Sequence, residues 1–269
     1  MKRLASFFAV LFFVSAAFSQ GNPVMEIAYM KVPPNGAEEY ISMEQEIWKP
    51  VHRERISNGK LLGWYLLRVE YPGGTNANYN FVAVNIYPSI ADLDDPYAGI
   101  DWKTIHPAVD ASQLMERTDA SRDMVHTEIF ELIDEAIPGQ PEVMPRFITV
   151  NKMLTPVGGN TDYEELERRI WKPIHRERIR QQKMEDWMLL RRILPNGTKW
   201  TYNYITWDAY ASYLDYNAPF QEEAFDRIHP NKRMDKTMEQ TAETRTHYAQ
   251  EMWSVVDYLF HTSRKTTSN

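Results

Sequence analysis

The sequence predicts an α+β protein made of two tandem copies of a βαββαβ unit. The first observation is an internal repeat. When the chain is displaced by 123 residues, positions 25–137 align with 148–260 without a gap, and 37 of the 113 pairs are identical. The second observation is that IWKPVHRERI at 47–56 recurs as IWKPIHRERI at 170–179. The third is that both copies show the same order of strand-like and helix-like patterns.

The elements of the first copy follow in order along the chain. Residues 25–32 predict a short strand, and residues 37–58 have the spacing of a helix. The runs 64–71 and 79–87 are rich in aromatic and branched residues and are joined by a Pro-Gly-Gly turn, which predicts a β-hairpin. A polar, mostly helical stretch covers 89–122, and 125–133 form the last strand. This is the order of the ferredoxin-like βαββαβ unit.

The repeat divides the chain into parts. The proline-rich stretch between the copies is the natural linker. We expect a signal peptide at 1–20, a first ferredoxin-like repeat at 21–136, a linker at 137–146, a second repeat at 147–260 and a polar tail at 261–269.

The N-terminus has the composition of a secretory signal. Lys2 and Arg3 precede an apolar run at 4–18, and small and polar residues follow up to Ser19 and Gln20. The run is shorter than the roughly 20 residues that span a bilayer. We therefore expect an exported protein, periplasmic or extracellular, with no membrane attachment after cleavage; a retained N-terminal anchor is the alternative.

The amino-acid composition argues against several classes of partner and ligand. The chain has no cysteine, so it uses neither disulfides nor thiolate ligands. Its formal net charge of -7 argues against nonspecific binding to nucleic acid or anionic lipid. We found no HExxH, GxSxG or glycine-rich phosphate loop, and we expect no metal site.

An antiparallel sheet with helices on one face needs cover on its other face, and the second copy can provide it. Two ferredoxin-like units, sheet facing sheet and helices outside, resemble the dimeric α+β barrel superfamily in tandem form. That superfamily includes antibiotic-biosynthesis-type monooxygenases, NIPSNAP-like proteins, haem-degrading oxygenases and chlorite-dismutase-like haem proteins. The resemblance covers nearly the whole mature chain through element order and duplication. It implies an intramolecular pseudo-dimer and, because no catalytic motif matches, no particular reaction.

The repeated decapeptide lies on the predicted helix. A helical wheel places Glu44 and Arg55 on the stripe that faces the sheet, with Trp48 and His52 at its edge. Buried charges need partners, because an unpaired buried charge is costly. Such residues can form a network that fixes the packing of helix on sheet, or they can form a site.

Three further expectations concern neighbouring positions. Pro50 should kink or restart the helix, since it lacks an N–H group. Lys49 and Arg53 should point to solvent. On the strand 79–87, Val82 and its alternate neighbours should face the helices, which would leave an aromatic and polar face between the sheets.

We expect one small-molecule pocket in each half, between helix and sheet. Arginine beside tryptophan favours a planar or anionic ligand. The candidate ligand-binding residues are Trp48, His52, Arg55, Arg68, Asn80 and His106 in the first copy, and Trp171, His175, Arg178, Arg191, Asn203 and His229 in the second.

Two other functions remain open. One is a haem-binding protein or haem-linked oxygenase, with His52 or His106 and their repeats as axial ligands. The other is a non-catalytic envelope or interaction module whose aromatic residues serve sheet packing. The cofactor, and whether the protein is an enzyme, are left undetermined. The copies differ at Asp101/Ala224, Trp102/Phe225 and His126/Ala249, so one site can have diverged.

Overall fold

The computed structural model describes residues 21–138, 144–197, 199–217 and 220–260. The predicted signal peptide, the predicted tail and the middle of the predicted linker lie outside the described residues. Within the described part of the chain, no helix has the length and apolar character needed to cross a bilayer.

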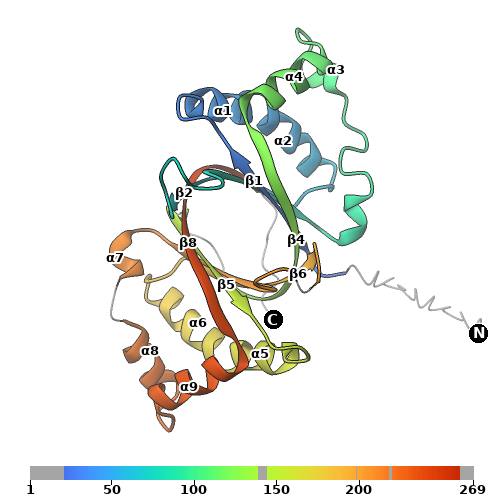
Figure 1. The fold of residues 1–269 in the computed structure, drawn as a ribbon. Helices are drawn as coiled ribbons and strands as arrows, with labels where there is room; N and C mark the ends of the chain where they lie inside the picture. Colours follow the sequence, from blue (N-terminus) through green and yellow to red (C-terminus); the bar gives the residue numbers. More distant parts are fainter. Residues whose placement is uncertain (1–20, 139–143, 198, 218–219, 261–269) are drawn as a thin grey trace, which may run out of the picture.

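Eight strands close into one barrel in the order β1-β3-β2-β8-β5-β7-β6-β4, and the helices lie outside it at two opposite sides (Figure 1). Neighbouring strands are antiparallel throughout. The strands are β1 (Val24–Lys31), β2 (Gly63–Tyr71), β3 (Phe81–Tyr87), β4 (Asp123–Ala136), β5 (Phe147–Leu154), β6 (Asp186–Leu194), β7 (Tyr204–Tyr210) and β8 (Thr246–Phe260).

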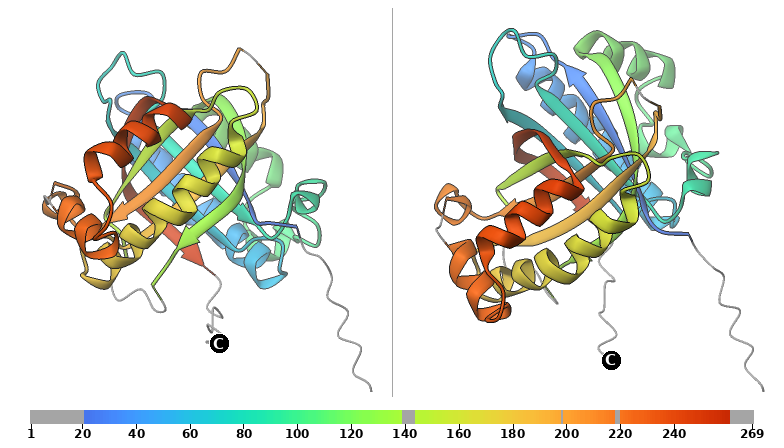
Figure 2. Two further views of the ribbon diagram at one scale, coloured as in Figure 1. Left: turned by 90° about the horizontal axis from the view of Figure 1, so that it is seen from below. Right: turned by 60° about the horizontal axis from the view of Figure 1, so that its bottom comes forward.

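We call the part up to Ala136 the first half and the part from Phe147 the second half. The first half contains the helical segments α1 (Ala37–Met43), η1 (Glu44–Trp48), α2 (Lys49–Ser57), η2 (Ile90–Leu93), α3 (Trp102–Ile105) and α4 (Ala111–Ser121). The second half contains α5 (Asn160–Leu166), η3 (Glu167–Trp171), α6 (Lys172–Arg180), α7 (Tyr213–Tyr216), α8 (Phe220–Ile228) and α9 (Met234–Thr244). Helices α5 and α6 with α9 lie over the outer face of the strands (Figure 2).

The last strand of each half joins the two halves. Strand β4 pairs with β1 and also with β6, and β8 pairs with β5 and also with β2. Each is longer than the strand predicted at 125–133, because it serves two partners along its length. All strand edges are thereby paired, which removes the open edges that promote aggregation.

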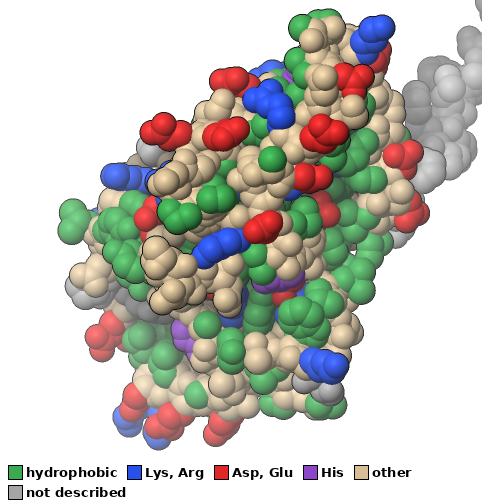
Figure 3. All heavy atoms as spheres, turned by 45° about the horizontal axis from the view of Figure 1, so that its top comes forward, with side chains coloured by type: hydrophobic (Ala, Val, Ile, Leu, Met, Phe, Trp, Pro, Cys, Tyr) green, Lys and Arg blue, Asp and Glu red, His purple; other side chains and the backbone are tan. Residues whose placement is uncertain are grey.

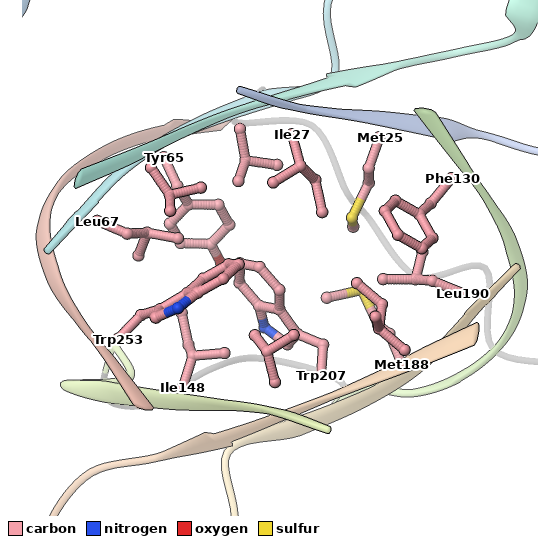
Figure 4. Close-up of a cluster of buried hydrophobic side chains, with 14 of the residues drawn as sticks. Met25, Ile27, Tyr65, Leu67, Phe130, Ile148, Met188, Leu190, Trp207 and Trp253 are labelled. Atoms are coloured by element: carbon pink, nitrogen blue, oxygen red, sulfur yellow. The ribbon is translucent and has the colours of Figure 1, made fainter. Parts of the chain in front are cut away.

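The interior of the barrel is filled with apolar side chains from both halves (Figure 4). Val82, Val84 and Ile86 point into this core, whereas Phe81 and Tyr87 pack toward the helices. The prediction for the strand 79–87 was therefore wrong about its faces. Both of its faces are buried and largely apolar, so alternation alone did not distinguish inside from outside.

Charged side chains also lie inside the barrel wall. Glu128 accepts hydrogen bonds from the hydroxyls of Tyr29 and Tyr202 at 2.9 and 2.5 Å and forms an ion pair with Arg192 at 2.8 Å. Glu251 likewise pairs with Lys152. Each of these two buried carboxylates is thus paired with one cation, which offsets part of the cost of burying its charge.

The helix that carries the decapeptide continues through its proline. A π-helical segment, η1 or η3, ends at the tryptophan, and the α-helix restarts at the next residue, with the proline in its first turn. Lys49 was predicted to point to solvent, which is wrong. Its Nζ forms an ion pair with Asp257 on β8, and Lys172 pairs with Asp134 on β4 in the same way.

Candidate functional site

A cavity of about 440 Å³ lies in the second half, between the helices and the outer face of the barrel. This volume is within the usual range of small-molecule sites, roughly 300 to 1,000 Å³. Its walls combine aromatic, polar and charged groups from the strands β5, β6, β7 and β8 and from the helical segments η3, α6, α7 and α9. They include Thr149, Asn151, Glu167, Trp171, His175, Arg178, Trp187, Thr206, Asp208, Tyr210, Tyr216, Arg245, His247 and Gln250.

Three of the predicted residues come together in this cavity, namely Trp171, His175 and Arg178. The π-helical segment η3 ends at Trp171, whose Nε1 donates to Oγ1 of Thr241 at 3.1 Å. His175 and Arg178 follow on α6. A π-helical turn shifts the following residues around the helix axis, and such turns are frequent at functional sites.

Arg178 is the buried cation of the cavity. It is 5% exposed, and its one hydrogen bond to the described residues runs from Nη2 to the Tyr210 hydroxyl at 3.4 Å. Its Nε has no hydrogen-bonding partner. The guanidinium carbon lies 5.6 Å from the centre of the Tyr210 ring. The protein alone therefore satisfies this cation poorly.

His175 stacks on Trp187, with ring centres 5.0 Å apart and planes at 17°. Burial, helped by the charge of Arg178, lowers the pKa of His175 to about 3. The imidazole is therefore neutral at ordinary pH. Its Nδ1 lacks a hydrogen-bonding partner.

Two carboxyl groups complete the charge of the cavity. Burial raises the pKa of Glu167 to about 7, although Arg245 lies close enough to lower it. Burial also raises the pKa of Asp208 to about 6, opposed by Arg178. Asn151 donates to Oδ2 of Asp208 at 3.2 Å, and Oδ1 of Asp208 is buried without a partner. At neutral pH Asp208 is mostly ionised.

The equivalent arginine in the first half has different surroundings. Arg55 is fully buried, and it donates to the Pro96 carbonyl at 2.9 Å and the Tyr87 hydroxyl at 2.9 Å. A third hydrogen bond joins it to Nδ1 of His52 at 3.1 Å. The ring of Tyr97 lies 4.5 Å from its guanidinium carbon. The protein therefore satisfies Arg55 by itself.

A local difference in sequence explains this contrast. Residues 94–101 form turns, with Gly99 in the left-handed region at φ +77°, and they bring Pro96 and Tyr97 to Arg55. In the second half a glutamate, Glu222, replaces this glycine, and α8 forms there instead. Glutamate is a good helix former and glycine a poor one. The helix packs against α6 and takes the place of the turns.

The carboxyl group opposite the arginine has also changed strands. In the first half Glu26 on β1 pairs with Asn85 on β3. In the second half Thr149 on β5 pairs with Asp208 on β7. One carboxyl near the arginine is kept in both halves, but it comes from the opposite member of the cross-strand pair.

The other predicted residues have structural contacts. His106 and His229 place Nε2 at 3.0 Å from the carbonyl oxygens of Ile47 and Ile170. Asn80 bonds the backbone of Val32 through both side-chain atoms, and Asn203 bonds Thr155.

The two arginines on the hairpin strands lie elsewhere. Arg68 is exposed over the ring of Phe81, and Arg191 forms ion pairs with Glu131 and Glu164. None of these residues lines the cavity.

The prediction omitted most residues of the cavity, including four that contribute to its charge or its aromatic wall. Glu167, Trp187 and Arg245 are identical to Glu44, Trp64 and Arg122 in the first copy, so the repeat alignment contained this signal. Asp208 differs from Asn85 and carried no such signal. Only the comparison of the cross-strand pairs indicates it, since Glu26 faces Asn85 in the first half and Thr149 faces Asp208 in the second.

The histidines predicted as axial haem ligands can be examined for a nitrogen atom that is free to bind iron. Haem iron binds a histidine nitrogen that has a free lone pair. The Nδ1 of His52 accepts from Arg55, and Nε2 of both His106 and His229 contacts a carbonyl. The lone pair of the His52 Nδ1 is thus engaged within the protein. His106 and His229 donate from Nε2 and therefore keep the lone pair of Nδ1. Among the described residues, no group of three His, Asp or Glu side chains is placed to hold a metal ion.

The closed eight-stranded barrel with helices outside is the dimeric α+β barrel fold. No protein-family model matches the sequence, and no curated protein matches it. The structure is similar to a proposed monooxygenase from Lactobacillus acidophilus NCFM, with a TM-score of 0.55 and 13% identity over 89% of this chain and 96% of that chain.

Two further solved structures show the same fold. A proposed monooxygenase from Fusobacterium nucleatum has a TM-score of 0.51 and 9% identity over 89% of this chain and 95% of that chain. A chlorite dismutase variant from Candidatus Nitrospira defluvii, in complex with cyanide, has a TM-score of 0.51 and 9% identity over 89% of this chain and 92% of that chain. At such identities the likeness concerns the fold, and function must come from the site.

Proposed function

We propose that this protein is exported and binds a small polar molecule, with a negatively charged or planar group, in the cavity of the second half. The observation that carries the proposal is Arg178, a buried cation in the wall of this cavity with one long hydrogen bond. A buried charge that lacks partners costs several kcal/mol. A ligand oxyanion would supply those partners.

We also propose that the two halves arose by duplication of a ferredoxin-like unit and that only the second half keeps a working pocket. The recurring element order and the aligned decapeptides support a duplication. The closed contacts of Arg55 support the loss of a site in the first half. Export rests on the N-terminal composition alone.

The interaction-module alternative has less support. A filled barrel interior fits it, but the charged cavity in the second half has no role in such a module. Acidic and basic side chains are interspersed on the face drawn in Figure 3. That face therefore lacks the one-sign patch that would attract nucleic acid.

The test compares two matched arginines. Arg178→Gln and Arg55→Gln would each be made in the mature chain and examined by thermal shift with a panel of small carboxylates and phosphates. We expect compounds that stabilise the wild type and the Arg55→Gln variant, and whose stabilisation Arg178→Gln removes. The proposal fails if no compound separates Arg178→Gln from the wild type. A Soret band after haemin titration would instead support the haem alternative.

A further inference from the structure

The cavity of the second half contains two cations and two acids that do not neutralise one another directly. Arg178 and Arg245 are the cations, and Asp208 and Glu167 are the acids. Among the described residues, none of these four forms an ion pair within 4 Å. Two buried carboxylates of the barrel wall are paired by contrast, Glu128 with Arg192 at 2.8 Å and Glu251 with Lys152.

The unpaired atoms of these residues include both hydrogen-bond donors and a hydrogen-bond acceptor. The Nε atoms of Arg178 and Arg245 are hydrogen-bond donors without an acceptor. The Oδ1 atom of Asp208 is an acceptor without a donor. A simple anion would be matched by the charges of the two arginines but would lie near the like charge of the Asp208 carboxylate. A simple cation would do the reverse.

The acid Asp208 lies on the same strand, β7, as the tyrosine that contacts Arg178. Asp208 and Tyr210 point to the same face of β7, since residues two apart in a strand do so, and Tyr210 is the residue that contacts Arg178. The carboxylate therefore lies beside the arginine. Two amide side chains, Asn151 and Gln250, line the same wall and are hydrogen-bonded to each other. They can orient a ligand without adding charge.

We propose that the ligand is a small zwitterion of the amino-acid type, whose carboxylate meets Arg178 and whose ammonium group meets Asp208. This inference rests on the proposed function and names the chemical class of its ligand. In an α-amino acid the ammonium and carboxylate groups are attached to the same carbon, so the two opposite charges match an arginine and an acid that lie side by side. Charge-assisted hydrogen bonds of this kind are about twice as strong as neutral ones.

The experiment uses three sets of probes on the full mature chain: free L-amino acids, their N-acetyl derivatives and their amides. The N-acetyl derivatives keep only the negative charge, and the amides keep only the positive charge. Binding would be measured by isothermal titration calorimetry. We expect at least one free amino acid to bind at least tenfold more tightly than its N-acetyl derivative or its amide.

Two variants separate the contributions. Asp208→Asn gives the amide that the first half has at Asn85, and should abolish the tenfold preference for the free amino acid over its N-acetyl derivative. Glu164→Gln is the control, because Glu164 is a carboxyl of the second half that pairs with Arg191 at 2.9 Å and does not line the cavity. It should keep the preference.

Different results would overturn the zwitterion inference and the proposed anion site. If N-acetyl derivatives bind as tightly as free amino acids and Arg178→Gln abolishes both, the zwitterion inference is wrong and the proposed anion site stands. If free amino acids bind but Asp208→Asn and Glu164→Gln behave alike, the assigned role of Asp208 is wrong. If the probes do not bind, while compounds of the carboxylate panel still separate Arg178→Gln from wild type, only the zwitterion inference falls.

Discussion

The Nζ of Lys49 lies 2.6 Å from Oδ1 of Asp257, and this ion pair joins a helix of the first half to a strand of the second. Lys172 and Asp134 repeat the pair with the halves exchanged. The two lysines occupy the same position in the two copies of the decapeptide. One reason for keeping this decapeptide twice is therefore the joining of the halves.

The double variant Lys49→Ala/Lys172→Ala should be less stable than the wild type by about 1 to 2 kcal/mol. Each pair is partly buried, so it should exceed the median exposed ion pair but remain modest. The measurement is urea unfolding at neutral pH. The control is Arg53→Ala/Arg176→Ala, which removes the neighbouring arginine of each decapeptide. Equal losses in the two double variants would refute the joining role of the lysines.

His106 should stabilise the π-helical segment of the first half. Its Nε2 lies 3.0 Å from the carbonyl oxygen of Ile47, a residue of η1. Replacement by alanine leaves this half-buried carbonyl without its partner, which costs about 1 to 3 kcal/mol. We expect His106→Ala to lower the free energy of unfolding by this amount, as measured by denaturant titration.

The same replacement should leave binding in the other half unchanged. If His106→Ala impaired ligand binding without loss of stability, the structural role assigned to this histidine would be wrong. His229→Ala, which frees the carbonyl of Ile170 beside Trp171, should affect both stability and binding.

Glu167 should make stability depend on pH. Burial raises its pKa from 4.5 to about 7 in the folded protein. A raised carboxyl pKa contributes stability that is present below pH 4.5 and is lost as the pH rises to 7, because the unfolded chain releases the proton first. The shift corresponds to a ceiling of about 3 kcal/mol.

Glu167→Gln cannot ionise, so it should lose less stability than the wild type between pH 4.5 and 8. The measurement is the thermal midpoint across this range. Glu165→Gln is the control, since that glutamate is half exposed and forms only a 3.6 Å surface pair with Arg169. A wild-type pH profile in the Glu167→Gln variant would show that this carboxyl is not the source.

Ligand binding should also follow the charge of the cavity. Burial raises the pKa of Asp208 to about 6, so this acid loses its negative charge below that pH. A zwitterion then loses its ammonium partner, whereas a simple anion gains from the more positive cavity. We expect the free amino acid's tenfold preference over its N-acetyl derivative to shrink between pH 7.5 and pH 5. A constant preference in calorimetry over this range would contradict the role of Asp208.

Much of the fold could be predicted from the sequence. The order of elements and the α+β class followed from the repeat and the patterns of 2 and 3.6 residues. The helix face that carries Trp171, His175 and Arg178 was predicted as well, since the spacing of a helix fixes which residues lie together. The faces of β3 were not predictable by alternation, because Phe81 and Val82 are both buried.

The different surroundings of Arg55 and Arg178 could not be predicted from the repeat alignment. In the first half the turns that contain Pro96 and Tyr97 contact Arg55, whereas in the second half α8 begins at Phe220, the counterpart of Tyr97. That choice is made by helix propensity together with tertiary packing, and single-residue identities do not report it. Asp208 was missed for a related reason, since the acid of this cross-strand pair lies on β1 in the first half, as Glu26, and on β7 in the second.

The most direct test of the central claim is a crystal structure of the mature protein with the best-binding compound of the carboxylate and amino-acid panels. Difference density should lie in the cavity of the second half, with an oxyanion within hydrogen-bonding distance of the Arg178 guanidinium. Density instead beside Arg55 and Tyr97, inside the barrel, or only on the surface would contradict the claim.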